Sequence, residues 1–289
     1  MKVLVTGASG LLGSRMLKCF PPDWQVSGTY HEHPAPGLVK CSLSSLRSLA
    51  RLLHDGGYGC VVHCAATCSP DACERDPRKA VEVNARGTEL VARAVGNARV
   101  KLVYASTDAV FPGDAPPYRE QDPPAPLSVY GHSKLAGEKH VLAVPGALVV
   151  RMSALYSADL GAPNNVLTGL KESLEAGRTV PADDRVVRYY TLAEGVAAAV
   201  AFLVARGARG IVHVSAEERS TKLEFFRAAA DAMGLDAGLV LPAELPAGSA
   251  PRPRDSHLDT SLYSSLAGPP FEGYRQALGR LRARGPGLV

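Results

Sequence analysis

Apolar, β-branched runs alternate with stretches of helical periodicity through the first half of the chain. The runs lack the polar alternation of half-exposed strands, which is typical of strands buried on both faces of a parallel sheet. The pattern predicts strands at residues 2–6, 25–30, 60–65, 101–106 and 147–152, and helices at 11–19, 43–54, 78–96 and 128–144. This alternation indicates an α/β fold, a doubly wound parallel sheet of the Rossmann type.

The second half is more often interrupted by proline and glycine, which cluster at residues 112–126 and 242–253. It predicts helices at 190–205, 221–233 and 274–284, and a strand at 210–214. These pieces are too interrupted to suggest a second independent core. We therefore expect a dinucleotide-binding domain over residues 1–152 and a smaller substrate-binding lobe over 153–289, with some segments returning to the first domain.

Composition narrows the class of partner. The chain has 289 residues, 21% of them charged, and a net charge of +4, which argues against nucleic acid or a membrane surface as a partner. No apolar run reaches the ~18 residues needed to span a bilayer. A strand is predicted directly after Met1, which leaves no room for a signal peptide. We therefore expect a cytoplasmic protein.

Six cysteines fall in the first quarter of the chain, and in a cytoplasmic protein we expect them to be free thiols. His63, Cys64, Cys68 and Cys73 raise the question of a metal site. Their spacing matches no zinc-finger or zinc-ribbon pattern, and neighbouring residues of a strand point to opposite faces. No bound metal is predicted.

The opening turn carries Gly7, Gly10 and Gly13 between the first predicted strand and helix. Glycines at this spacing allow a tight turn, a close approach of the backbone to a diphosphate, and close packing of helix on sheet. The free N–H groups of the helix N-terminus then favour the phosphates. The turn predicts a dinucleotide site.

The end of the second strand normally carries an acid that binds the ribose hydroxyls of NAD. Here Tyr30 and His31 occupy that place, and Glu32 follows late. The missing acid, with His31, His33 and Arg15 nearby, favours NADPH as the cofactor. A solvated loop that accepts both NADPH and NADH is the alternative.

Tyr130 and Lys134 lie four residues apart in a predicted helix, so they share one face of it. An ammonium beside a phenol favours the phenolate and lowers its pKa toward the working range. Thr107, just beyond the fourth strand, has a hydroxyl suited to stabilising a developing oxyanion. Ala65 and Ala66, at the end of the third strand, are small enough for a cofactor to lie against the backbone. Together these residues predict redox chemistry on a carbonyl.

These stretches resemble the extended short-chain dehydrogenase/reductase superfamily, and within it the dTDP-4-dehydrorhamnose reductase family. The likeness covers nearly the whole chain and includes G-A-S-G-L-L-G, V-V-H-C-A-A, V-N-A-R-G-T, S-T-D-A-V-F-P-G, P-L-S-V-Y-G-H-S-K-L-A-G-E and R-P-R-D-S-H-L-D-T-S. The regulatory β subunit of methionine adenosyltransferase is similar in the same regions, notably in H-C-A-A and P-Y-R-E.

The resemblance implies a reductase that passes a hydride from NADPH to the C4 carbonyl of a nucleotide-linked 4-keto-6-deoxy sugar. Tyr130 would protonate the oxyanion, Thr107 would hydrogen-bond it, and Lys134 would hold the ribose and depress the pKa of Tyr130. The implied cofactor contacts are Gly7, Ser9, Gly10, Leu11, Leu12, Gly13, Tyr30, His31, Cys41, Ser42, Cys64, Ala65, Ala66, Tyr130 and Lys134. The implied substrate contacts are Thr107, Asp108, Ala154 and Arg252. Both Arg252 and Arg254 are candidates to pair with the diphosphate, and a solvated basic loop is the alternative for them.

Several positions depart from the family pattern. The stretch at residues 41–44 lacks the acid that usually helps hold the adenosine, and Cys68 replaces the residue common beside the nicotinamide. Tyr190 and Leu262 replace a proline and a lysine, and Arg15 stands where some relatives carry a metal-binding glutamate. These departures leave the sugar open.

Three other functions compete with the reductase. A 4,6-dehydratase would need an acid after Asp108, where the chain has Ala109. A sugar-nucleotide epimerase keeps the Tyr-Lys pair, but this chain is short for one. A non-catalytic NADP-binding regulatory subunit, similar to methionine adenosyltransferase β, is the alternative from another class. The predicted helices at 78–96 and 128–144 are candidates to pair in a homodimer.

Overall fold

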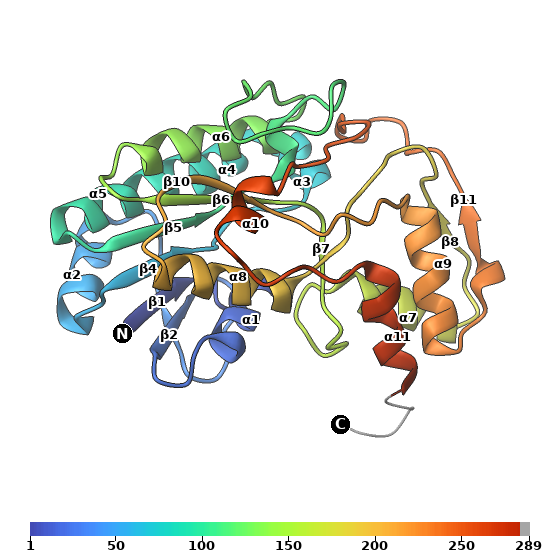
Figure 1. Cartoon of the computed structure of the whole chain (residues 1–289), viewed down its shortest axis with the longest axis horizontal. Helices are drawn as coiled ribbons and strands as arrows, with labels where there is room; N and C mark the ends of the chain where they lie inside the picture. Colours follow the sequence, from blue (N-terminus) through green and yellow to red (C-terminus); the bar gives the residue numbers. More distant parts are fainter. Residues whose placement is uncertain (284–289) are drawn as a thin grey trace.

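A seven-stranded parallel sheet forms the centre of the protein (Figure 1). The computed structural model describes residues 1–283. The strands are, in sheet order, β10 (Gly210–Val214), β6 (Leu148–Met152), β5 (Lys101–Ala105), β4 (Cys60–His63), β1 (Lys2–Thr6), β2 (Gln25–Tyr30) and β3 (Leu38–Lys40). The predicted doubly wound parallel sheet is confirmed.

Helices cover both faces of this sheet because successive strand residues point to opposite sides (Figure 1). On one face, Val3 and Val5 pack against α1 (Leu11–Cys19) and α8 (Ala193–Ala205). On the other face, Leu4 packs in a second core. That core includes buried residues of α2 (Leu46–Gly56), α5 (Thr88–Ala98) and α6 (Val129–Leu142). The carboxyl ends of the strands are left free, and the smaller lobe lies over them.

The smaller lobe has a core of its own, contrary to the expectation from its interrupted sequence. Tyr156, Phe225 and Tyr274 pack together there, and Tyr190 stacks on Phe225 with 3.7 Å between ring centroids. The lobe's elements are α7 (Val166–Glu175), α9 (Lys222–Met233), α11 (Tyr274–Ala283), the paired strands β8 (Val180–Ala182) and β11 (Val240–Pro242), and the paired strands β7 (Leu155–Tyr156) and β9 (Thr191–Leu192). The division at residue 152 stays a prediction.

The differences from the predicted elements are local. The predicted helix 78–96 is divided into α4 (Pro77–Val81), a π-helical turn (Glu82–Gly87) and α5. The helix predicted from residue 190 begins at Ala193, because the two preceding residues form β9. The predicted helix 274–284 is α11, and Arg284 lies outside the described residues. The further short elements are α3 (Pro70–Arg75), α10 (Ser261–Ser265) and 3-10 turns at Asp108–Val110 and Ala237–Leu239.

No helix in the described part of the chain combines the length and the apolar character that crossing a membrane requires.

The glycine turn before α1 gives a test of the packing. A Cβ on Gly13 would lie 2.8 Å from the Cα of Ala8 and closer still to the carbonyl oxygen of Gly7. Gly13→Ala is therefore expected to lower the free energy of unfolding by about 1–3 kcal/mol, since backbone must shift. Urea denaturation measures the change.

Gly96→Ala is the matched control, because Gly96 lies in α5 and a Cβ there would meet nothing within 4 Å. Alanine in an open helical position is expected to raise the free energy of unfolding by about 0.5–1 kcal/mol. Equal effects of the two substitutions would contradict the packing argument.

Candidate functional site

One cavity of about 1170 Å³ lies at the carboxyl ends of the strands and beneath the smaller lobe. It is lined by the turn between β1 and α1, by the segments after β2, β4, β5 and β6, by the start of α6, and by residues near 188 and 252. All the implied cofactor contacts line this cavity, and so do the substrate candidates Thr107, Asp108, Ala154 and Arg252, whereas Arg254 does not. Their individual roles stay predictions.

The glycine turn leaves room for a ligand against the backbone. Gly7 has a φ of +68°, and a Cβ there would lie 2.6 Å from the Cα of Ala65. The N–H of Gly10 donates to the carbonyl of Gly7 at 3.0 Å, and Gly10 precedes α1 as its N-cap and offers no side chain to cap the helix. The first N–H groups of α1 are thus available to an anion. The residues present fit the diphosphate of a dinucleotide.

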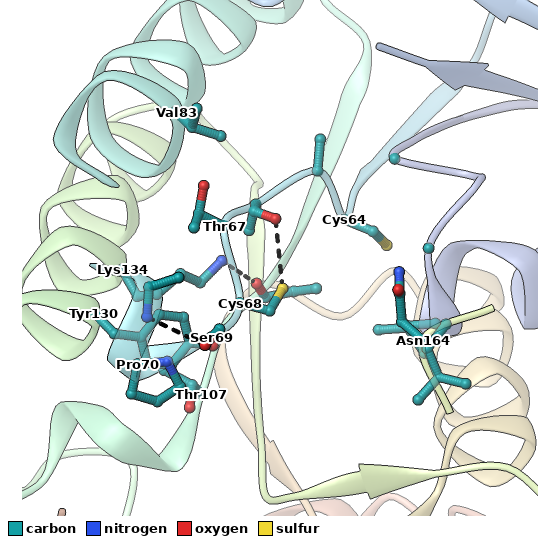
Figure 2. A pocket seen from close by; sticks show the side chains of 18 of the residues that line it. Cys64, Thr67, Cys68, Ser69, Pro70, Val83, Thr107, Tyr130, Lys134 and Asn164 are labelled. Carbon is teal, nitrogen blue, oxygen red and sulfur yellow. Dashed lines mark hydrogen bonds between the residues drawn. The ribbon is translucent and has the colours of Figure 1, made fainter. Parts of the chain in front are cut away.

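Helix α6 carries Tyr130 and Lys134 into the cavity. The hydroxyl of Ser128 caps the helix by accepting from the N–H of Gly131 at 3.1 Å. Figure 2 shows Tyr130 and Lys134 on the same side of the cavity as Thr107, with Asn164 on the opposite side. The helix start therefore brings the phenol and the ammonium to the end of β5.

The phenol of Tyr130 is protonated at neutral pH. Burial raises its pKa well above 10, the charges of Cys68 and Asp108 raise it further, and a hydrogen bond with Thr107 opposes the rise. Lys134 is not among the main causes of this shift, so a lowering of the Tyr130 pKa by Lys134 stays a prediction. The ammonium of Lys134 donates to the carbonyl of Ala105 at 2.7 Å. A protonated phenol can act as a proton donor.

Asp108 links the end of β5 to the C-terminal part of the chain. One carboxylate oxygen accepts from the hydroxyl of Thr107 at 3.1 Å, and the other accepts from the hydroxyl of Ser256 at 2.6 Å. Burial raises the pKa of Asp108, and the nearby charge of Arg188 opposes the rise. The R-P-R-D-S motif thus supplies a side chain to the candidate site.

The arginines of the C-terminal motif have different surroundings. Arg252 lines the cavity, and its guanidinium binds Asp71 at 2.7 Å. Arg254 is exposed and does not line the cavity, so its expected pairing with a diphosphate is wrong for this structure. Sequence reasoning missed Arg188, which lines the cavity and, within residues 1–283, donates through its side chain only to backbone carbonyls, at 3.1 Å and 3.3 Å.

Arg15 does not belong to the cofactor region, although the sequence placed it there. It is buried and pairs with Asp159 at 2.6 Å and with Glu194 at 3.6 Å. The cavity near the end of β2 is lined instead by Tyr30, His31, Glu32 and His33, and by Lys79 from α4. Arg15 therefore does not favour NADPH over NADH in this structure.

The π-helical turn fixes the loop that follows β4. Asn84 accepts from the N–H of Thr67 at 2.8 Å and donates to the carbonyl of Thr67 at 3.1 Å and to the hydroxyl of Ser133 at 2.9 Å. Sequence reasoning missed this residue because it predicted a continuous helix. Its contacts join the loop that carries Cys68 to α6, and Cys68 lies on the cavity wall (Figure 2).

All six cysteines lie in the described part of the chain and are free thiols. Surrounding protein raises the pKa of Cys68, and the charge of Lys134 opposes the rise. In residues 1–283 no group of three or more His, Cys, Asp or Glu side chains is arranged to hold a metal ion.

A buried ion pair connects α6 to β6 and to the segment that follows β5. Glu138, one turn beyond Lys134 in α6, binds the guanidinium of Arg151 at 2.7 Å, with side chains 1% and 2% exposed. Glu138 also accepts from the hydroxyl of Ser106 at 2.5 Å. Because Ser106 directly precedes Thr107, the same carboxylate holds the helix with Tyr130 and the strand end with Thr107.

Comparison with known proteins agrees with this geometry. The family model for the RmlD substrate binding domain matches residues 1–285. Methionine adenosyltransferase 2 subunit beta of Danio rerio is 36% identical over 275 residues, covering 92% of this chain and 84% of that protein. Agl14 of Haloferax volcanii, a probable low-salt glycan biosynthesis reductase, is 34% identical, covering 90% of each chain. A solved dTDP-4-dehydrorhamnose reductase from Clostridium acetobutylicum matches with a TM-score of 0.87 and 26% identity, covering 98% of this chain and 99% of that one.

Removing one partner of the buried pair tests its importance. Glu138→Ala is expected to lower the free energy of unfolding by about 3–5 kcal/mol, because Arg151 keeps a buried charge without compensation. Glu89→Ala is the control, since Glu89 faces Arg93 at 3.9 Å on the exposed side of α5. That change is expected to stay within about 0.5 kcal/mol. Similar losses in the two variants would contradict a special role for the buried pair.

Proposed function

Because the chain belongs to the RmlD substrate binding domain family of extended short-chain dehydrogenases/reductases, we propose that it is an NADPH-dependent reductase of a nucleotide-linked 4-keto-6-deoxy sugar. The observation that carries the proposal is the meeting of Thr107, Tyr130 and Lys134 in one cavity with the glycine turn. The turn fits a dinucleotide diphosphate, and the phenol is placed to donate a proton. Such a site suits reduction of a carbonyl.

The bound nicotinamide would supply the hydride. Gly7, Gly10 and the N-terminus of α1 would hold the diphosphate, and Lys134 would hold the cofactor ribose. Tyr130 would give its proton to the carbonyl oxygen as negative charge develops there, and Thr107 would hydrogen-bond the same oxygen. The buried setting keeps the phenol protonated until that charge appears.

The part of the cavity lined by Asp108, Arg188 and Arg252, called the substrate part below, is suited to a charged sugar nucleotide. Asp108, held by Ser256, offers a carboxylate that can accept from a sugar hydroxyl. Arg188 lines the cavity, and among the described residues its guanidinium binds backbone carbonyls alone, so its charge is available to a phosphate. Arg252 lines the same region but already pairs with Asp71. We therefore assign the diphosphate of the substrate mainly to Arg188.

A regulatory subunit is the second candidate, favoured by the likeness to methionine adenosyltransferase 2 subunit beta at 36% identity over 92% of this chain. In that case NADPH binding would be retained without turnover of a keto sugar. Formation of a stable complex with a methionine adenosyltransferase in size-exclusion chromatography, with no NADPH oxidation, would favour this candidate over the reductase.

Tyr130→Phe is expected to lower kcat at least ~100-fold while NADPH affinity stays nearly unchanged, because the phenol acts mainly in the transition state. Oxidation of NADPH with dTDP-4-keto-6-deoxy sugars, followed at 340 nm (the absorbance of reduced nicotinamide), measures the loss. Tyr58→Phe is the control, since Tyr58 does not line the cavity. A Tyr130 variant that kept most of its kcat would show that another group donates the proton.

A further inference from the structure

The cations that line the cavity are unevenly distributed. Among the described residues, the lysines and arginines on the cavity wall are Lys79, Lys134, Arg188 and Arg252. Lys134 lies beside Tyr130, and its ammonium binds the carbonyl of Ala105. Arg188 and Arg252 belong to the substrate part. Lys79 is left as the cavity-lining lysine next to the end of β2, where the adenosine ribose of a dinucleotide would lie, whereas Lys40, paired with Tyr30 in the sheet, does not line the cavity.

Lys79 is held in place by the start of its own helix. The side chain of Asp76 caps α4 by accepting from the N–H of Lys79 at 3.0 Å, and Pro77 takes the first helical position. The loop after β4 and the short α3 bring α4 back to the cavity mouth. The ammonium therefore reaches the β2 end from a segment far away in the sequence.

The ammonium of Lys79 faces the carboxylate of Glu32, with 3.6 Å between nitrogen and oxygen. Both side chains are more than half exposed, at 56% and 58%. An ion pair this exposed is weak and can be exchanged for another partner. Glu32 thus lies opposite the ammonium, two residues beyond the end of β2.

We propose that Lys79 and Glu32 set the choice between NADPH and NADH, an inference that rests on the dinucleotide site of the proposed function. Lys79 binds the 2′-phosphate of NADPH, and the phosphate replaces the carboxylate of Glu32 as its partner. Glu32 repels that phosphate but accepts from the 2′-hydroxyl of NADH. The two side chains therefore act in opposite directions on the 2′ position of the adenosine ribose.

Other charged groups at this end of the cavity have their own partners or are shared by both cofactors. Asp76 is engaged with the backbone of α4, and Glu82 faces Arg86 at 3.8 Å. His31 and His33 also line this end and add hydrogen-bond donors next to the ribose. The two histidines do not form a pair of opposite charges that face each other, as Lys79 and Glu32 do.

Titration of the purified protein with NADPH and with NADH, followed by nucleotide fluorescence, tests the pair without any substrate. Lys79→Gln is expected to weaken NADPH binding about tenfold and to change NADH binding less than about twofold. Glu32→Gln is expected to tighten NADPH binding about fivefold. Adenosine 2′,5′-bisphosphate carries the same phosphate as NADPH. Its affinity, measured by displacement of the fluorescent nucleotide, is therefore expected to change in the two variants in the same direction as that of NADPH.

Arg78→Gln is the matched control, because it removes the same charge from the neighbouring exposed residue of α4, which does not line the cavity. Equal effects of Lys79→Gln and Arg78→Gln, or equal weakening of NADPH and NADH by Lys79→Gln, would overturn the inference. Keto-sugar turnover by a protein whose cofactor choice ignores Lys79 would overturn the pair and leave the reductase standing. Absence of binding by either nucleotide would overturn both.

Discussion

A carboxylate and a guanidinium that are both shut away from water must neutralise each other, and Glu138 and Arg151 do so between α6 and β6. The carboxylate of Glu138 also accepts from the hydroxyl of Ser106, directly after β5. One group therefore fixes three neighbouring elements. Tyr130 and Lys134 on the helix and Thr107 on the strand end keep their relation because this buried pair has a single arrangement.

Close backbone packing also holds α6 against the sheet. A Cβ on Gly137 would lie 2.5 Å from the hydroxyl of Tyr104 and 2.7 Å from the carbonyl of Asn84, so α6 can approach the sheet only with glycine there. His63 stacks on the same Tyr104 and bridges the hydroxyls of Thr6 and Thr88 at 2.6 Å and 3.0 Å. Burial lowers the pKa of His63 to about 3, so the bridge is neutral at physiological pH.

The sequence predicted most reliably what depends on local pattern. Buried strands are mostly apolar, so β1, β4, β5 and β6 were evident, and the glycine turn and the Tyr-Lys pair carry their own spacing signals. Lys79 and Arg15 show why the rest was missed. Arg15 is near the β2 end in sequence but turns to Asp159, whereas Lys79 is distant in sequence and reaches that end through α4. Partners of charged side chains depend on tertiary placement, which periodicity does not record.

The hydrogen bond from Ser256 to Asp108 has a consequence for synthesis of the protein. During translation the strands up to β6 can pair before the C-terminal motif exists, and β10 can join them later. The substrate part of the cavity is still unfinished at that point, because Ser256 and Arg252, which pairs with Asp71, come after all seven strands of the sheet in the chain. A nascent or truncated chain can thus form the glycine turn before α1 while it still lacks the part of the cavity wall that would bind the sugar.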